Sequence, residues 1–253
     1  MIINNESGEM MIDLHCHILP GVDDGAENME DAIAMARLAA QSGVTDIVAT
    51  PHFRGERSSM QLLPLIDERL AEFREAIKDE GIDIKIHSGA EILCLPETPY
   101  LPKDIKLPTI GQGNYILTEF YFDETEYNIS ESLRSVAERG YIPVVAHPER
   151  YEAVQGDPRI LARWFREGYV LQVNKGSVMG AMGRGAERVA DFMLENGLAH
   201  VIASDAHSPR RRTTDKRRLN EYLSDILDEE YVEILLRRNA SRILRGKNIV
   251  PIN

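Results

Sequence analysis

The sequence is poor in cysteine, in aromatic residues and in long apolar runs. Its 253 residues include only two cysteines, Cys16 and Cys94, too few for a disulfide framework in a chain of this length. A reducing cytoplasm is therefore the simpler expectation. Because no run of about 18 apolar residues occurs, we expect no membrane-spanning helix. Polar residues 1–10 lack the apolar core of a signal peptide.

Positive charge is also scarce. The chain has 29 Lys and Arg against 41 Asp and Glu, a formal net charge of -12. Such a surface repels phosphates, so we expect no non-specific binding to nucleic acid or to an anionic membrane. The net charge says nothing against a small local anion site. The hydrophobic content of 43% suffices for a sizeable core. We expect residues 1–10 to form a tail or edge element and residues 11–253 to form one domain.

Short β-branched apolar runs alternate with helical patterns along the chain. The runs predict seven strands, at 12–16, 45–50, 83–89, 115–120, 142–147, 169–174 and 199–204. Apolar residues at three-to-four spacing predict helices at 28–42, 62–80, 129–139, 158–167, 185–196, 215–227 and 229–245. A glycine closes most of these helices just before the next strand: Gly43, Gly81, Gly140, Gly168 and Gly197. The alternation predicts an α/β fold with a parallel sheet, close to a distorted (β/α)7 barrel; a doubly wound open sheet is the alternative.

Ionisable residues gather where the predicted strands end. In such folds the carboxyl ends of the strands meet on one face, where active sites form. The side chains expected there are His15, His17, His52, Glu91, Glu119, His147, Asp205 and His207. Each motif alone is more often structural, but carboxylates packed together repel one another unless cations lie between them. Imidazole and carboxylate suit manganese, iron or zinc, so the shared position predicts a metal site.

The ordered motifs resemble those of a known family. The set HCH, DD, TPH, GAE, LTEF, VAHPER and SDAH resembles the polymerase and histidinol phosphatase (PHP) superfamily, from residue 12 to about residue 245. More narrowly, HILPGVDDG, GAEI, VAHPERY and IASDAHS resemble the manganese-dependent protein-tyrosine phosphatases of bacterial capsule and exopolysaccharide operons.

The resemblance implies three divalent metal ions, with manganese expected first and iron or zinc as alternatives. It implies a first ion held by His15, His17, Glu91 and Asp205, a second held by Glu91, Glu119 and His147, and a third held by Asp24, His52 and His207. The family's ligand is the second aspartate before the glycine, which favours Asp24 over Asp23. Spacing alone does not separate these two aspartates.

Arginines follow two of the candidate ligands. Arg150 stands three residues after His147, and Arg210, Arg211 and Arg212 follow His207. A guanidinium binds phosphate through two parallel hydrogen bonds, but most members of a basic run are simply solvated. The resemblance selects Arg150 and Arg212 as catalytic and substrate-binding residues and leaves Arg210 and Arg211 open. Asn174, which ends the sixth predicted strand, is expected to contact substrate or a ligand.

The expected activity is hydrolysis of phosphotyrosine in a protein. Three divalent ions would outweigh the carboxylates of the site and leave positive charge for a bridging hydroxide and an arriving phosphate. The resemblance implies that the partner is the tyrosine-rich tail of a bacterial tyrosine kinase that regulates capsule or exopolysaccharide synthesis. The alternatives are a small-molecule phosphatase of the histidinol phosphate type, a polymerase-associated exonuclease module and a non-catalytic scaffold.

Hydrolysis of phosphotyrosine is often carried out by a nucleophilic cysteine, and the sequence argues against that chemistry here. Cysteine-dependent phosphatases need an arginine six residues after the nucleophile, but Val22 and Tyr100 stand six residues after Cys16 and Cys94. On a strand, Cys16 points away from the face of its two neighbouring histidines. We therefore expect Cys16 to be a small buried apolar residue that takes no part in catalysis.

Overall fold

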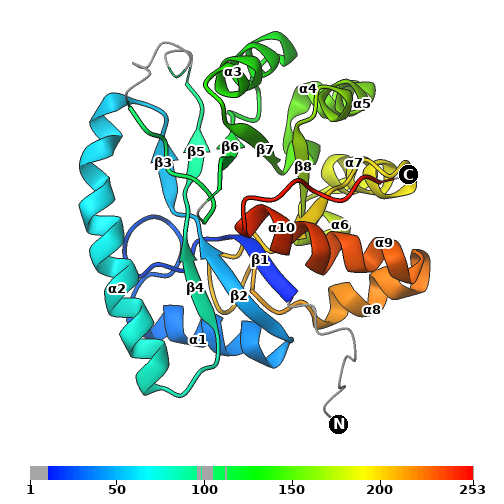
Figure 1. The fold of residues 1–253 in the computed structure, drawn as a ribbon. Coiled ribbons are helices and arrows are strands. Elements are labelled where there is room, and N and C mark those ends of the chain that lie inside the picture. The colour runs from blue at the N-terminus through cyan, green and yellow to red at the C-terminus, as the bar shows by residue number, and fades with distance from the viewer. Residues whose placement is uncertain (1–10, 96–97, 99–104, 112, 253) are drawn as a thin grey trace.

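The computed structural model describes residues 11–95, 98, 105–111 and 113–252, so the predicted tail at residues 1–10 lies outside the described residues. Helices surround a set of strands in this part of the chain (Figure 1). Every strand pairing in it is parallel, which confirms the predicted α/β fold. None of its helices is long and apolar enough to cross a membrane.

The strands form two sheets. The three-stranded sheet has the order β1-β2-β4, and the six-stranded sheet has the order β3-β5-β6-β7-β8-β9. The bounds of the strands are β1 (Met11–Cys16), β2 (Val44–Ala49), β3 (His52–Arg54), β4 (Lys85–Ser88), β5 (Glu91–Leu93), β6 (Tyr115–Glu119), β7 (Ile142–Ala146), β8 (Val170–Asn174) and β9 (Val201–Ala203). The seven predicted strands are all present, and two short strands that were not predicted, β3 and β5, follow β2 and β4.

Two short breaks carry the chain from the first sheet into the second. Residues 50–51 separate β2 from β3, and residues 89–90 separate β4 from β5. Pro51 cannot donate a backbone hydrogen bond, while its carbonyl accepts one from Glu91 N at 3.1 Å. A Cβ atom on Gly89 would lie 2.6 Å from Val48 Cγ1, so the chain needs glycine there. His52 and Glu91 therefore start two short strands and pair directly in register.

The end of β1 lies between the ends of two other strands. Its last residue, Cys16, bridges Ala206 beyond β9, and its carbonyl accepts a hydrogen bond from Thr50 N at 2.9 Å. His17 N donates to Ala206 O, and Asp205 N donates to His15 O, each at 2.9 Å. These bonds bring the histidine pair of β1 beside the segment that contains Asp205 and His207.

The helices lie close to their predicted positions. Their bounds are α1 (Met29–Gln41), α2 (Leu63–Asp79), α3 (Glu126–Glu138), α4 (Glu152–Gly156), α5 (Arg159–Arg166), α6 (Lys175–Val178), α7 (Arg184–Glu195), α8 (Arg217–Ile226), α9 (Glu229–Glu233) and α10 (Asn239–Leu244). All five predicted capping glycines have positive φ, between 62° and 88°. The prediction of one helix over 229–245 was incomplete, because a π-helical turn at Ile234–Arg238 joins α9 to α10. Helices α4 and α6 were not predicted, since four or five residues show no period.

Residues on the strands alternate between two apolar clusters. Leu117 and Val144 pack in one cluster with Ile243 of α10, whereas Ile116 and Val145 belong to the larger cluster that includes the outer helices. Both faces of the sheet are thus covered by apolar contacts, as parallel sheets require. The polar side chains of the strands are left at their carboxyl ends.

His200, just before β9, has a structural role. Its side chain is 4% exposed, its Nδ1 accepts a hydrogen bond from Leu171 N at 3.0 Å, and its ring stacks on Phe165 with centroids 4.7 Å apart. Burial lowers the pKa of His200 to about 4. Because an unfolded histidine titrates near 6.5, the unfolded chain binds an extra proton between these pH values.

We predict that His200 stabilises the fold at neutral pH and that this contribution is lost as the pH falls from 6.5 toward 4. Relative to His200→Asn, the wild type should lose about 2 kcal/mol of unfolding free energy between pH 7 and pH 5. Urea unfolding of both proteins at the two pH values measures this difference. An unchanged difference would show that His200 does not titrate in this way.

Candidate metal centre

The structure brings all nine predicted ligands together at the carboxyl ends of the strands. They come from β1 and the loop after it, from the starts of β3 and β5, from the end of β6, and from the segments after β7 and β9: His15, His17, Asp24, His52, Glu91, Glu119, His147, Asp205 and His207. Two of them have left-handed backbone conformations, His147 with φ 34° and Asp205 with φ 48°. Such conformations are unfavourable for residues with a side chain and are often found at functional sites.

Glu91 lies at the middle of this cluster. Its Oε1 lies 2.9 Å from His147 Nε2 and 3.2 Å from His15 Nε2, and its Oε2 lies 3.1 Å from His17 Nε2 and 3.2 Å from His52 Nδ1. The side chain is only 1% exposed. A carboxylate that presents both oxygens to several imidazoles can bridge two ions.

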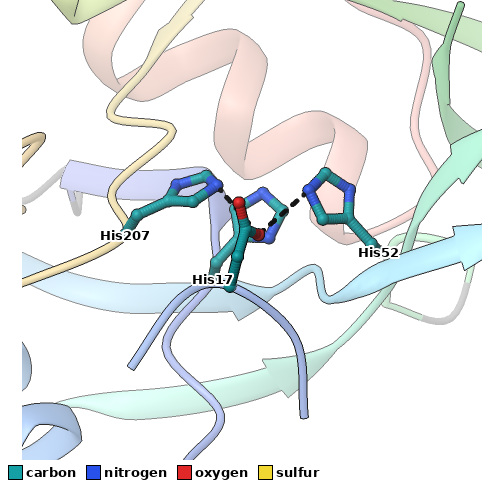
Figure 2. A group of neighbouring side chains, drawn as sticks. His17, His52 and His207 are labelled. Atoms are coloured by element: carbon teal, nitrogen blue, oxygen red, sulfur yellow. Dashed lines mark ion pairs between the residues drawn. The ribbon is translucent and has the colours of Figure 1, made fainter. Parts of the chain in front are cut away.

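An outer group of four ligands opens to solvent. The ligand atoms of His17, Asp24, His52 and His207 all lie within 4.8 Å of one another. Asp24 Oδ1 is 3.3 Å from His52 Nε2 and 3.6 Å from His207 Nε2, and its side chain is 70% exposed. In Figure 2, His52 and His207 face each other on either side of His17. This group is the most accessible position for an ion.

Three further groups lie deeper and share members with one another. They are His15 with His147 and Asp205, His15 with His17 and Glu91, and His52 with Glu91 and Glu119. The grouping differs in detail from the one that the resemblance implies, because His17 also lies in the outer group and His52 also lies beside Glu119. The donor set of imidazoles and carboxylates fits first-row divalent metals.

Asp23 and Asp24, which spacing could not distinguish, have different environments. Asp23 Oδ2 accepts hydrogen bonds from His17 Nδ1 at 2.7 Å and from His52 N at 3.0 Å, and its Oδ1 accepts one from Gly25 N at 2.9 Å. Burial alone would raise the pKa of Asp23, but the bond and charge of His17 lower it to about 2. Asp23 thus orients His17 so that Nε2 faces the cluster, as partners of metal-bound histidines do.

Gln172 has a similar orienting role that the sequence did not reveal. Its Oε1 accepts a hydrogen bond from His15 Nδ1 at 2.9 Å, and its Nε2 donates to Asn174 Oδ1 at 3.0 Å. The side chain is fully buried in β8. The only signal in the sequence is a polar residue two positions before Asn174, on the same face of a strand whose other residues are mainly apolar.

The cluster combines groups whose charges depend on one another. Burial would lower the pKa values of His15 and His17, but Glu91 and other carboxylates raise both, that of His17 to about 10. Burial would raise the pKa of Glu91, but the surrounding histidines hold it well below its usual range. Burial and the charge of Glu91 raise the pKa of Glu119. Positive charge is therefore required to keep these carboxylates ionised together.

Two arginines and Asn174 meet at Asp205. Arg150 Nη1 lies 3.4 Å from Asp205 Oδ2, and Arg212 forms an ion pair with the same oxygen while its Nε donates to Asp205 O at 3.1 Å. Asn174 Nδ2 also donates to Asp205 Oδ2. Arg210 is 81% exposed and lies 3.6 Å from Asp31. The structure thus brings the expected Arg150, Arg212 and Asn174 to the cluster and directs Arg210 elsewhere.

Together, the fold and the cluster define a class: α/β proteins that present a candidate metal site of histidines and carboxylates at the carboxyl ends of parallel strands. Residues 11–245 match the family model described as "Capsular polysaccharide synthesis, CpsB/CapC", and the chain belongs to this family.

Several relatives of the chain are named as tyrosine-protein phosphatases. The chain is 31% identical to the tyrosine-protein phosphatase YwqE of Bacillus subtilis (strain 168), over 94% of this chain and 93% of YwqE. It is 31% identical to the tyrosine-protein phosphatase CpsB of Streptococcus pneumoniae, over 78% of this chain and 83% of CpsB. A solved structure from work on YwqE and CpsB, described as unique metal-dependent tyrosine phosphatases, superimposes with a TM-score of 0.85 and 32% identity, over 95% of this chain and 96% of that one.

Cys16 lies among the ligands in sequence but is buried in the apolar core. Its side chain has no exposed surface and packs in the cluster that contains Met35 and Ala36 of α1, with Sγ 3.9 Å from Ala206 O. Burial raises the pKa of the Cys16 thiol well above its usual range and that of Cys94 to about 12. Neither thiol is available as a thiolate nucleophile.

We predict that Cys16→Ser lowers stability by about 1–2 kcal/mol, because a hydroxyl replaces a buried thiol, and leaves kcat within about threefold of the wild type. Chemical denaturation and a phosphatase assay measure the two effects. Loss of most activity in a variant that still folds would contradict the assignment of Cys16 to the core.

Proposed function

We propose that this protein is a metal-dependent protein-tyrosine phosphatase. The observation that carries the proposal is the convergence of nine imidazole and carboxylate ligands beside two arginines, in a chain whose relatives are named as tyrosine-protein phosphatases. The reaction is hydrolysis of a phosphate monoester, in which a hydroxide attacks phosphorus in line with the departing tyrosinate.

The proposed cofactor is a set of three divalent ions. Manganese is the metal that we propose, and iron and zinc are the alternatives. His15, His17, Glu91 and Asp205 would hold one ion, Glu91, Glu119 and His147 a second, and Asp24, His52 and His207 a third. The overlapping ligand groups support more than one ion, and the central position of Glu91 supports a bridging role. Bound ions would supply hydroxide at neutral pH and neutralise the phosphoryl oxygens in the transition state.

The side chains around the ions do the binding and orienting. Arg150 and Arg212, now paired with Asp205 Oδ2, can turn their remaining N–H groups to the oxygens of a phosphate. Asn174 donates beside them, and Asp23 holds His17 in orientation. Tyrosinate has an ordinary pKa of about 10, so it departs with less help from a general acid than an alkoxide needs.

The proposed substrate is a phosphotyrosine protein. The proposed partner is the tail of a bacterial tyrosine kinase that regulates capsule or exopolysaccharide synthesis. The family description, which names capsular polysaccharide synthesis, supports this choice. The same reasoning leads us to propose a cytoplasmic location, where such kinase tails and free thiols are found. We further propose that residues 11–253 are one domain and that the two sheets form one distorted (β/α)7 barrel, in which β2 with β3 and β4 with β5 each count as one bent strand. The bridge between Cys16 and Ala206, which joins the end of β1 to the segment after β9, supports this closure.

We predict that the manganese-loaded protein hydrolyses a tyrosine-phosphorylated peptide at least tenfold faster, in kcat/KM, than histidinol phosphate, and does not degrade single-stranded DNA. Metal analysis and the three assays test this in one preparation. Preferential turnover of histidinol phosphate would overturn the proposal in favour of a small-molecule phosphatase. Absence of both bound metal and turnover would indicate a non-catalytic scaffold.

His52 offers a direct test of the outer ligand group. It is 39% exposed, so His52→Ala should fold normally. We predict that this variant loses about 100-fold or more in kcat and binds one ion fewer, because both ring nitrogens face carboxylates of the cluster. His87→Ala is the matched control, since His87 pairs with Asp46 on β2, away from the cluster. Equal metal content and rate in both variants would remove His52 from the site.

A further inference from the structure

Phe122 is an exposed aromatic residue at the edge of the candidate centre. It follows β6, three residues after Glu119, and its side chain is 40% exposed, whereas Phe120 nearby is buried at 2%. Its carbonyl accepts a hydrogen bond from Glu152 N at 2.8 Å, which ties this loop to the start of α4. The backbone of Phe122 is therefore fixed relative to the segment that contains His147 and Arg150.

The ring of Phe122 contacts the side of the cluster where Arg150 and His147 lie. Arg150 Cζ lies 4.3 Å from the centroid of the Phe122 ring, within the range of a cation–π contact. The His147 ring is 6.0 Å from the same ring, centroid to centroid. Arg150 thus lies between an aromatic ring and Asp205, and part of that ring remains open to solvent beside the site.

We propose that Phe122 recognises the phenyl ring of the phosphotyrosine substrate, a role that rests on the proposed function. In phosphotyrosine one oxygen joins the ring to phosphorus, so a phosphate bound at Arg150 brings that ring next to the side chain that packs on the guanidinium. Two aromatic rings attract each other in offset or edge-to-face arrangements. An alkyl phosphate has no ring to place there, so Phe122 favours aryl over alkyl phosphates.

The alternative is that Phe122 only holds Arg150 in place and does not contact the substrate. The two roles differ in what they predict for ligands, because a misplaced Arg150 weakens every phosphate analogue alike. Phenylphosphonate and methylphosphonate share the anionic group and differ in the ring, and neither is hydrolysed. Calorimetric titration of the manganese-loaded protein with each compound separates recognition of the ring from binding of the anion.

The expected result is that Phe122→Leu raises the Kd of phenylphosphonate about fivefold to tenfold and leaves that of methylphosphonate within about twofold. Phe122→Tyr should retain wild-type Kd values, because it keeps the ring. Phe122→Met is a second variant without a ring in case leucine lowers the Tm. Tyr121→Leu is the matched control, since Tyr121 is 46% exposed and the cation–π contact of Arg150 among the described residues is with Phe122 and not with Tyr121.

Equal weakening of both phosphonates in Phe122→Leu would overturn the proposal and leave Phe122 as a positioning residue for Arg150. Equal binding of both phosphonates by the wild type would also overturn it. The proposed function fails separately, if the wild type hydrolyses no phosphotyrosine peptide, because the titrations need no turnover.

Discussion

The organisation of this protein depends on the mutual repulsion of carboxylates held close together. Asp24, Glu91, Glu119 and Asp205 converge with five histidines at one edge of the strands, and Glu91 and Asp205 are about 1% exposed. Buried carboxylates at such separations do not all stay ionised without positive charge between them. Histidines and arginines supply part of this charge, and the divalent ions that we propose would supply the rest. The proposed chemistry uses the same charge to accept a phosphate.

The backbone places these side chains through a few special features. The breaks after β2 and β4 turn His52 and Glu91 into paired residues at the start of new strands, in direct register. The end of β1 is bonded to Thr50 on one side and to Asp205 and Ala206 on the other, so three ligand segments meet around one strand. The orienting bonds of Asp23 and Gln172 then fix which nitrogen of His17 and His15 faces the cluster. The positions of the candidate ligands are fixed by the rigid strands that carry them and by the hydrogen bonds that Asp23 and Gln172 make to the two histidines.

Much of this arrangement could be predicted from the sequence because it depends on periodic patterns. The strands, the long helices and the capping glycines are local features, and the ends of parallel strands must share one edge. The breaks at residues 50–51 and 89–90, and the short strands that follow them, could not be predicted. Where the chain leaves one sheet and enters the other depends on which strands it pairs with, and the sequence pattern does not contain that information. The choice between Asp23 and Asp24 depended on side-chain direction, which spacing does not contain. Gln172 and Phe122 were missed because single polar or aromatic residues become informative only when their neighbours in space are known.

The central claim, that divalent ions hold the carboxylate cluster together, is tested most directly by the thermal unfolding of the wild-type protein in manganese and in a chelator. An ion present at 100 times its Kd stabilises the native state by about 2.7 kcal/mol. In a chain of this size each kcal/mol raises the Tm by about 2–4 degrees, so several ions should raise it by about ten degrees or more. The account predicts a large Tm increase that saturates with manganese and is reversed by the chelator. A Tm that is the same in manganese and in chelator would contradict it.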